Sequence, residues 1–226
     1  MILLENTVTA SPEQWRAAIM GARNPMNSWD KSDSEFWPCH MNIGENDLGL
    51  MKRLVAAGTD HSKFMRFLPV TVDVTAPLYW WKEMDTYKVG TVANSCSTMH
   101  KIQAKEFTML DFSEDKLLLG IPKDSDHIYD DAGNDITMSS QQLLGHVINH
   151  LNVYRKLYLE TKDNRYWWQM IQLLPSSYNQ KRTMMLNYAV LRNIYFARRD
   201  HKLDEWHDFC KWIEKLPFSE LITLEK

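Results

Sequence analysis

The chain has 226 residues, 44% of them hydrophobic and 12% aromatic, which is enough to bury the core of one large domain or two small ones. A formal net charge of -3 argues against a general nucleic-acid-binding protein, because such a protein needs a basic face. Three widely separated cysteines, Cys39, Cys96 and Cys210, argue against a disulfide framework or a four-thiolate zinc site and fit a reducing cytoplasm. We expect a soluble, unprocessed cytoplasmic protein, since no targeting segment or run of roughly 18 apolar residues is present.

The first part of the sequence predicts two helices, a strand and a third helix. In "SPEQWRAAIM", Ser11, Pro12 and Gln14 form the capping-box pattern of a helix start. The segment "NDLGLMKRLVAAG" places its apolar residues on one helical face and ends at Gly58, a typical C-terminal cap. The segment "FLPVTVDVTAP" alternates valines with polar residues, as a half-buried strand does. Pro77 then suits the first turn of the helix "PLYWWKEMDTYK".

The segment "TYKVGTVANSCSTMHK", residues 86–101, has few large apolar side chains. Its hydroxyl and amide groups are carried by Thr91, Asn94, Ser95, Ser97 and Thr98. Many hydrogen-bonding groups at short spacing suit a loop that holds a polar ligand. A solvated loop or a strand edge is the alternative interpretation.

Between about residues 111 and 138 the chain becomes acidic and rich in turn-forming residues. Its aspartates include Asp124, Asp126, Asp130, Asp131 and Asp135. Their spacing does not match a calcium-binding loop, which needs a glycine at the sixth position and a terminal glutamate. We interpret the segment as a solvated surface excursion within a single domain that spans residues 1–226.

The remainder of the chain predicts further helices and one short strand. A long buried helix is expected over "SSQQLLGHVINHLNVYRKLYLE". His146 and His150 would share one of its faces, but without the glutamate of a zinc-protease helix we interpret them as core or surface histidines. The aromatic segment "RYWWQMIQLLP" precedes a strand, "KRTMMLN", and two helices, "YAVLRNIYFARR" and "LDEWHDFCKWIEKL". No nucleophile elbow, Walker loop or dinucleotide fingerprint is present, so covalent and P-loop chemistry have no support.

The order of these segments resembles that of flavin-dependent thymidylate synthases from about residue 20 to residue 215. The segment "GENDLGLMKRLVAAGTDHSKFMRFLPVTVDV" of this chain is similar to a part of the family that consists of a helix, a Ser-Pro-x-x-His segment and a strand. In the family, the next helix ends in the signature Arg-His-Arg-x-x-Ser-x-Asn-Glu-x-Ser-x-Arg-Tyr. Asn94 and Ser97 match the Asn and second Ser of this signature. With one inserted residue near Ala93, Thr91 stands for its first Ser and Lys88 for its second Arg. Further matches in order and separation are Arg165, Leu174-Pro175, Asn187, Asn193 and Arg198.

Several family positions carry different residues in this chain. Within the signature these are Thr86, Tyr87, Ser95, Met99 and His100, and in the later segments Ala189 and the "SKFMR" that ends in Arg66. The family's arginines hold the phosphates of the flavin and of dUMP through bidentate, charge-assisted bonds. Phosphate binding should therefore weaken by a few kcal/mol unless other cations compensate. The candidates for compensation are Lys88, Arg66, Arg182 and Arg192.

The resemblance implies an α+β fold, mostly helical with a small antiparallel sheet, and a homotetramer. It implies flavin-dependent transfer of a one-carbon unit from methylenetetrahydrofolate to a pyrimidine deoxynucleotide, dUMP to dTMP or a variant of it, with FAD as cofactor and NADPH as co-substrate. A non-catalytic nucleotide-binding or regulatory protein on the same fold is the alternative, and an unrelated helical interaction module is a third hypothesis. No metal is implied.

The resemblance also assigns roles to individual residues. Arg198 would be catalytic, and substrate would be bound by Ser97, Arg165 and Arg198. The cofactor would be bound by Arg66, Lys88, Thr91, Asn94, Asn187 and Asn193. At 100° per residue, Asn187 and Arg198 would lie within about 20° of the same helical face. A plain exposed arginine that suits the helix dipole is the alternative for Arg198.

Overall fold

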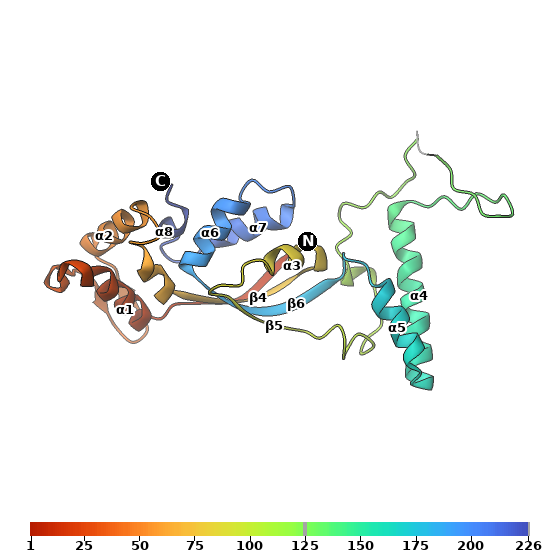
Figure 1. Cartoon of the computed structure of the whole chain (residues 1–226), viewed down its shortest axis with the longest axis horizontal. Helices are drawn as coiled ribbons and strands as arrows, with labels where there is room; N and C mark the ends of the chain where they lie inside the picture. Colours follow the sequence, from red (N-terminus) through yellow and green to blue (C-terminus); the bar gives the residue numbers. More distant parts are fainter. Residues whose placement is uncertain (124–125, 226) are drawn as a thin grey trace. The chain divides into compact units, whose positions relative to one another are not determined.

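The computed structural model describes residues 1–123 and 126–225 of the chain (Figure 1). Its residue contacts divide the chain into two compact units, each of which is described by itself. The larger unit takes residues 2–75, 82–94 and 181 onward. The smaller unit takes residue 1, residues 76–81 and residues 95–180.

A four-stranded sheet, most of whose residues belong to the larger unit, has the strand order β1-β4-β6-β5. Its strands are β1 (Leu3–Thr9), β4 (Pro69–Pro77), β6 (Asn179–Asn187) and β5 (Val92–Ser95). The strands expected around the valines and in "KRTMMLN" are β4 and β6, and both predictions are confirmed. β5 is an exposed strand at the end of the sheet, so the strand-edge interpretation holds for residues 92–95. β1 was not expected; it pairs antiparallel with β4 and has an irregularity between Glu5 and Val8.

The two faces of this sheet differ in polarity. One face is buried and carries Val70, Val72, Val74, Met184 and Leu186. On β4 the intervening position Asp73 accepts hydrogen bonds from Thr183 Oγ1 at 2.6 Å and Asn6 Nδ2 at 2.9 Å. Lys181 Nζ lies 3.3 Å from the same carboxylate. The bonds from Thr183, Asn6 and Lys181 together lower the pKa of Asp73 to about 2.

Asp73→Asn is expected to change the acid stability of the protein. A carboxylate whose pKa falls on folding stabilises the native state at pH values above its pKa in the unfolded chain, which is about 3.9. This contribution is lost as the pH drops towards about 2, the pKa of Asp73 in the folded protein. The stability of the wild type should therefore fall more steeply than that of the variant between about pH 4 and pH 2. Urea unfolding at several pH values measures this difference. Asp60→Asn, on an exposed turn, should keep the wild-type pH dependence, and equal slopes for wild type and Asp73→Asn would contradict the assignment.

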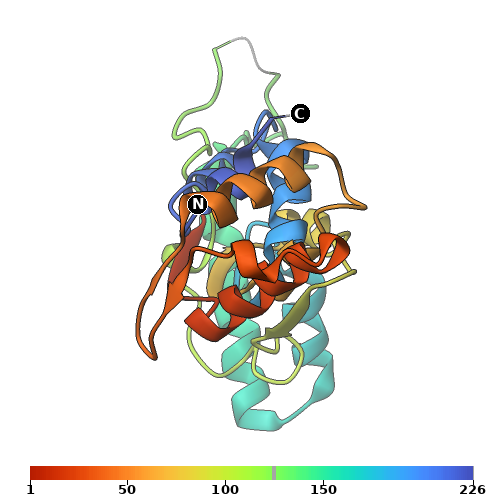
Figure 2. The same cartoon turned by 90° about the vertical axis from the view of Figure 1, so that its left-hand side faces the viewer.

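The larger unit also contains several helical segments, among them the short 3-10 helices η1 (Asn24–Met26) and η2 (Trp29–Lys31), and the main ones pack on one another. The main ones are α1 (Pro12–Arg23), α2 (Glu45–Ala56), the short 3-10 helix η3 (Lys63–Phe67), α6 (Tyr188–Arg198), α7 (Asp204–Ile213) and α8 (Glu220–Thr223). The capping box at Ser11 is confirmed, and the chain leaves α2 through Gly58 with φ +107°. α6 packs on α7, α8 and η3, while α1 packs on α2 and η3 (Figures 1 and 2). The helix expected over residues 77–88 is α3 (Leu78–Met84); Pro77 is instead the last residue of β4, and the helix ends four residues earlier than expected.

A buried ion pair joins α1 to α2. Arg23 is 3% exposed and Asp47 is fully buried, and Arg23 Nε lies 2.6 Å from Asp47 Oδ1. The second carboxylate oxygen accepts bonds from the hydroxyls of Ser32 and Ser34. Burial alone raises the pKa of Asp47, but the bonds from Ser34, Ser32 and Arg23 outweigh it and hold the pKa below its usual value. The pair therefore fixes residues 24–44, which include the small hairpin of β2 (Glu35–Phe36) and β3 (Met41–Asn42), to the helices.

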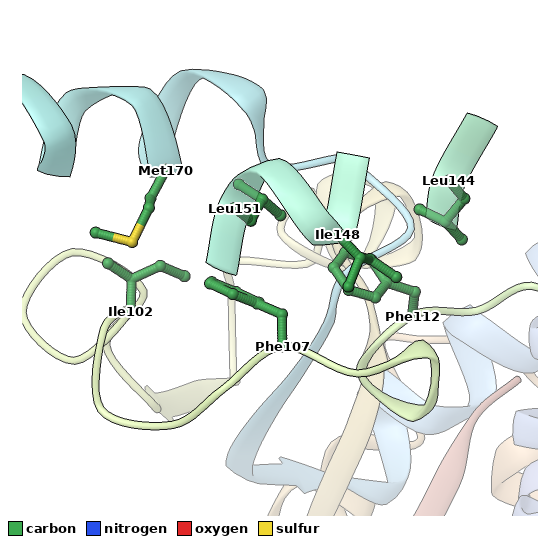
Figure 3. Packing of buried hydrophobic residues seen from close by; sticks show 7 residues of the cluster. All are labelled: Ile102, Phe107, Phe112, Leu144, Ile148, Leu151 and Met170. Carbon is green, nitrogen blue, oxygen red and sulfur yellow. The ribbon is translucent and has the colours of Figure 1, made fainter. Parts of the chain in front are cut away.

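The smaller unit has its own apolar core, built on α4 (Ser140–Thr161) and α5 (Asn164–Leu173). Figure 3 shows the cluster, which comprises Ile102, Phe107, Phe112, Leu144, Ile148, Leu151 and Met170. α4 confirms the expected long helix, but only one of its faces is buried; Leu143 is 56% exposed, and both His146 and His150 are exposed. Among the described helices, none combines the length and apolar character that a bilayer crossing needs.

The acidic segment begins inside this core. η4 (Met109–Asp111) leads to Phe112, which is buried, and to Ser113, which is 8% exposed. From residue 114 to residue 138 most described positions are exposed, and turns or bends occur at residues 115–117, 119–120, 123 and 131–133. Asp124 lies outside the described residues. Asp130 and Asp135 accept bonds from nearby backbone N–H groups, as carboxylates in solvated turns do.

Candidate functional site

The larger unit contains a cavity of about 930 Å³ beside α6. Its lining comes from the end of α2 and the turn after it, from η3, from the turn before β5, from α6 and from the C-terminal segment. The residues are Val55, Gly58, Thr59, Ser62, Met65, Arg66, Val89, Gly90, Asn187, Ala189, Val190, Arg192, Asn193, Phe196, Arg199 and Glu225. Apolar walls with a few charged and amide groups are typical of a small-molecule site.

α6 gives this cavity one continuous wall. β6 ends at Asn187 and α6 begins at Tyr188, so no loop separates strand from helix. Asn187 caps the helix, because its Oδ1 accepts a hydrogen bond from Val190 N at 3.1 Å. Residues 189, 192, 196 and 199 recur every three or four positions, with residue 193 beside them, and therefore share the face towards the cavity. The N-terminus of a helix favours an anion, and here it lies at the cavity.

Arg192 supplies a cation that has no carboxylate partner. Its Nη1 donates to the carbonyl of Ile222 at 2.7 Å, and its Cζ lies 4.6 Å from the centre of the Phe196 ring. Within residues 1–123 and 126–225 no carboxylate forms an ion pair with it, and burial lowers the pKa of Arg192. Arg66 likewise has no ion pair among these residues. Two guanidinium groups that line one cavity without counterions favour the binding of an anion.

Arg199 completes the charge of the cavity and differs from the other two arginines. Its Nη1 lies 2.8 Å from Glu225 Oε1, and its Nε lies 3.5 Å from Asp200 Oδ2. Glu225 lines the cavity, whereas Asp200 does not. The lining thus carries three guanidinium groups and one carboxylate, which leaves a formal charge of +2.

The predicted polar loop meets the cavity through its glycine. Gly90 has φ +77°, and a Cβ atom there would lie 3.0 Å from Val190 Cγ2 and 3.1 Å from Asn187 Nδ2. Only glycine combines this conformation with so close an approach to α6. Thr91 Oγ1 donates to the Tyr87 carbonyl and closes the turn. Val89 and Gly90 line the cavity. Lys88 precedes them in sequence, Thr91 and Asn94 follow them, and none of these three residues lines the cavity.

Arg198 points to a different set of partners. Its Nη1 lies 2.7 Å from Glu83 Oε2, its Nε donates to Tyr87 Oη at 3.0 Å, and its Cζ lies 4.8 Å from the centre of the Trp206 ring. Arg198 does not line the cavity, and its side chain is only 18% exposed. The expected common face with Asn187 was wrong, because Asn187 is the N-cap, with φ −131° and ψ 168°, so its side chain does not follow the 100° spacing of the helix.

Arg198→Ala is expected to lower the free energy of unfolding by about 1–3 kcal/mol, because it leaves a half-buried carboxylate at Glu83 without its strongest partner. A plain dipole contact at a helix C-terminus would contribute only about 0.3–1 kcal/mol. Chemical unfolding measures the difference. The matched variant Arg199→Ala, at the C-cap one residue beyond α6 and paired with the exposed Glu225, should cost less than about 1 kcal/mol. Equal costs for the two variants would show that the Glu83 contact is unimportant.

The other two predicted substrate residues belong to the smaller unit, beside a hollow of about 400 Å³. The hollow is lined by Met99, His100, Gln103, Tyr158, Asn164, Trp167 and Trp168. Ser97 Oγ accepts a hydrogen bond from His100 N at 2.9 Å, which shapes one edge. Arg165 follows Asn164, pairs with Asp163 at 2.7 Å and leaves 84% of its side chain exposed. Arg165 adjoins the lining residue Asn164 and Ser97 lies two residues before Met99, but neither lines the hollow itself.

The structure thus gathers Arg66, Asn187 and Asn193 around one cavity, together with Arg192, one of the cations expected to compensate. Arg182 instead pairs with Asp85 at 2.7 Å and does not line the cavity. Arg199, Phe196 and Gly90 were not predicted as site residues. Phe196 and Arg199 follow Arg192 at i+4 and i+7, and this spacing was the sequence signal that could have identified both of them.

No protein-family model matches the sequence, and no curated protein sequence matches it either. Solved structures do match. Thymidylate synthase X (ThyX) from Helicobacter pylori, solved with FAD and dUMP, aligns with a TM-score of 0.62 at 15% identity over 99% of this chain and 96% of that one. The chain has the ThyX fold. The UMP/dUMP methylase PolB from Streptomyces cacaoi, bound with 5-Br dUMP, matches the same fold with a TM-score of 0.59 at 17% identity over 99% and 94% of the two chains.

The ThyX fold confirms the expected α+β class with antiparallel strand pairing. Its solved examples named above bind FAD and dUMP in one case and a brominated dUMP in the other. The identity of 15–17% establishes the fold and leaves the chemistry of this chain to its own residues.

Proposed function

We propose that the chain is a flavin-dependent nucleotide methylase that transfers a one-carbon unit from methylenetetrahydrofolate to a pyrimidine deoxynucleotide such as dUMP. The observation that carries this proposal is the cavity of about 930 Å³ in which Arg192 and Arg66 have no carboxylate partner among the described residues. Proteins with the ThyX fold that bind FAD, dUMP or a dUMP analogue support the assignment of a nucleotide to such a cavity.

The residues present fit a flavin nucleotide. The formal +2 charge suits a diphosphate, and the amide of Asn193 adds a hydrogen-bonding group on the same helical face. Phe196, Val55 and Met65 supply apolar surface for rings. We therefore propose that Arg66, Arg192, Asn187 and Asn193 hold FAD, with Lys88, Thr91 and Asn94 on the adjoining turn and strand as further contacts.

A bound FAD, reduced by NADPH, would supply the hydride of this chemistry, so no residue of the chain would be needed as a nucleophile. The chain's residues bind and orient the reactants and hold charge near the developing anion. We propose that Ser97 and Arg165 bind the substrate phosphate beside the aromatic hollow of the smaller unit, where Trp167 and Trp168 offer stacking surface. Arg198 is a positioning residue: it bonds to the side chains of Glu83 and Tyr87 and so holds the segment that leads from them to Gly90.

The purified protein should be yellow, and denaturation should release the flavin. Calorimetric titration should show dUMP binding to the FAD-loaded protein, and the gene should rescue a thymidine-requiring bacterium. Protein that binds neither FAD nor dUMP, with each tested alone and together, would rule the proposal out.

A non-catalytic nucleotide-binding protein on the same fold is favoured by one observation. The hollow of the smaller unit carries Met99 where the family resemblance expects an arginine. Loss of that cation should weaken phosphate binding at this hollow. Protein that binds FAD and dUMP tightly but neither turns over nor rescues growth would select this function over the first.

We also propose that the chain assembles as a homotetramer. The exposed apolar side chains on α4 and α5, among them Leu143, Val153 and Trp168, are compatible with subunit contacts. Light scattering should give about four times the mass of the 26.6 kDa chain. A 26.6 kDa species alone at micromolar concentration would contradict this assembly.

A further inference from the structure

The C-terminal segment contacts two of the three cavity arginines. The carbonyl of Ile222, in α8, accepts a hydrogen bond from Arg192 at 2.7 Å. Beyond the end of α8, Glu225 Oε1 accepts one from Arg199 Nη1 at 2.8 Å. The carboxylate of Glu225 also lines the cavity, and it is the one acidic side chain that does so among the described residues.

These two contacts differ in how firmly they are held. Leu221 and Ile222 are fully buried, and α8 packs on α6 and α2, so the Ile222 carbonyl is fixed in place. Glu225 lies after the helix and its side chain is 73% exposed, while Arg199 is 37% exposed. An ion pair in such solvent contact is weak and readily exchanged for another anion. The Glu225 contact is therefore displaceable, whereas the Ile222 contact is not.

A carboxylate that bonds to a guanidinium offers the same acceptor geometry as a phosphate oxygen. Glu225 thus occupies the position on Arg199 that a ligand phosphate would use. Without Glu225 the lining would carry three guanidinium groups and no carboxylate.

We infer that Glu225 is a built-in competitor for the anionic ligand of this cavity, and that a bound diphosphate displaces it to reach Arg199. The inference rests on the proposed function only in taking the ligand to carry a diphosphate. It assigns to the C-terminal segment a regulatory contact: ligand affinity is set by the cavity arginines and reduced by the chain's own carboxylate.

Glu225→Gln should tighten binding of a diphosphate roughly threefold to fivefold, because the neutral amide no longer competes and no longer repels the ligand. Glu220→Gln is the matched control, since Glu220 lies in the same C-terminal segment but pairs with Lys52 at 3.5 Å and does not line the cavity. It should bind as the wild type does. In an Arg199→Ala background, Glu225→Gln should have less effect than in the wild type, because the group for which it competes is absent.

The experiment is calorimetric titration of the full-length protein and these variants with inorganic pyrophosphate and, separately, with FAD. Tighter pyrophosphate binding by Glu225→Gln but not by Glu220→Gln supports the inference, and it does so even if FAD fails to bind, in which case the proposed flavin function fails alone. If Glu225→Gln binds pyrophosphate with the affinity of the wild type, the inference is overturned. FAD binding by the wild type and by Glu225→Gln would in that case leave the proposed function standing. Absence of binding of either probe to every variant overturns both.

Discussion

Arg23→Ala is expected to lower the free energy of unfolding by about 3–5 kcal/mol. The substitution would leave the carboxylate of Asp47 fully buried with no cation, although Ser32 and Ser34 would still donate to it. It would also free the carbonyls of Ser28 and Lys31, which accept bonds from the same guanidinium. The loss should therefore loosen residues 24–44 as well as the contact between α1 and α2.

Urea unfolding at neutral pH measures this effect. Lys211→Ala is a suitable control, because Lys211 and Asp208 form an ion pair whose side chains are 68% and 53% exposed. That variant should lie within about 1 kcal/mol of the wild type. Asp47→Asn tests the same pair from the other side and should also destabilise strongly. A cost for Arg23→Ala no larger than that of the control would show that the buried pair is dispensable.

Arg192→Ala is expected to weaken FAD binding about tenfold to a hundredfold, which corresponds to the roughly 1.5–3 kcal/mol of a hydrogen bond to a charged group. Arg192 is half-buried, has no carboxylate partner among the described residues and stacks on Phe196, so its guanidinium is already positioned for an anion. Arg192→Lys should fall between wild type and Arg192→Ala, because lysine keeps the charge but loses the planar fork.

Arg53→Ala controls for the change in net charge, since Arg53 is exposed on α2 and does not line the cavity. Its FAD affinity should equal that of the wild type. Fluorescence of free and bound flavin or calorimetry gives the dissociation constants. Unchanged affinity in Arg192→Ala, with FAD still bound by the wild type, would place the flavin phosphates elsewhere.

Local sequence signals accounted for most helices and for β4 and β6. The capping box at Ser11 and the valine alternation of β4 act within a few residues, so both are visible in sequence. β1 was missed because its burial pattern shows no clean alternation and its pairing partner lies more than 60 residues away. A strand of this kind is stabilised by non-local hydrogen bonds, which composition does not reveal.

The site was predictable only in part. The family resemblance assigned Arg66, Asn187 and Asn193 to one cofactor, and all three line one cavity, although no local pattern required them to meet. Arg198 was expected to face a ligand and instead contacts Glu83, which lies 115 residues earlier in the chain. Which arginine faces the cavity depends on the rotation of α6 about its own axis, and a shift of one residue turns a side chain by 100°.

The direct passage from β6 into α6 has a consequence for how the length of this chain can vary. Because no loop residue separates Leu186 and Asn187 from Tyr188, nothing there can absorb an added or deleted residue. A single insertion would either flip the side chains of β6 to the opposite face or rotate α6 by 100° and carry Arg192 away from the cavity. The turn-rich residues 126–138 impose no such coupling. Insertions and deletions among natural variants of this chain should therefore accumulate in that exposed segment and avoid the strand-helix junction at Asn187.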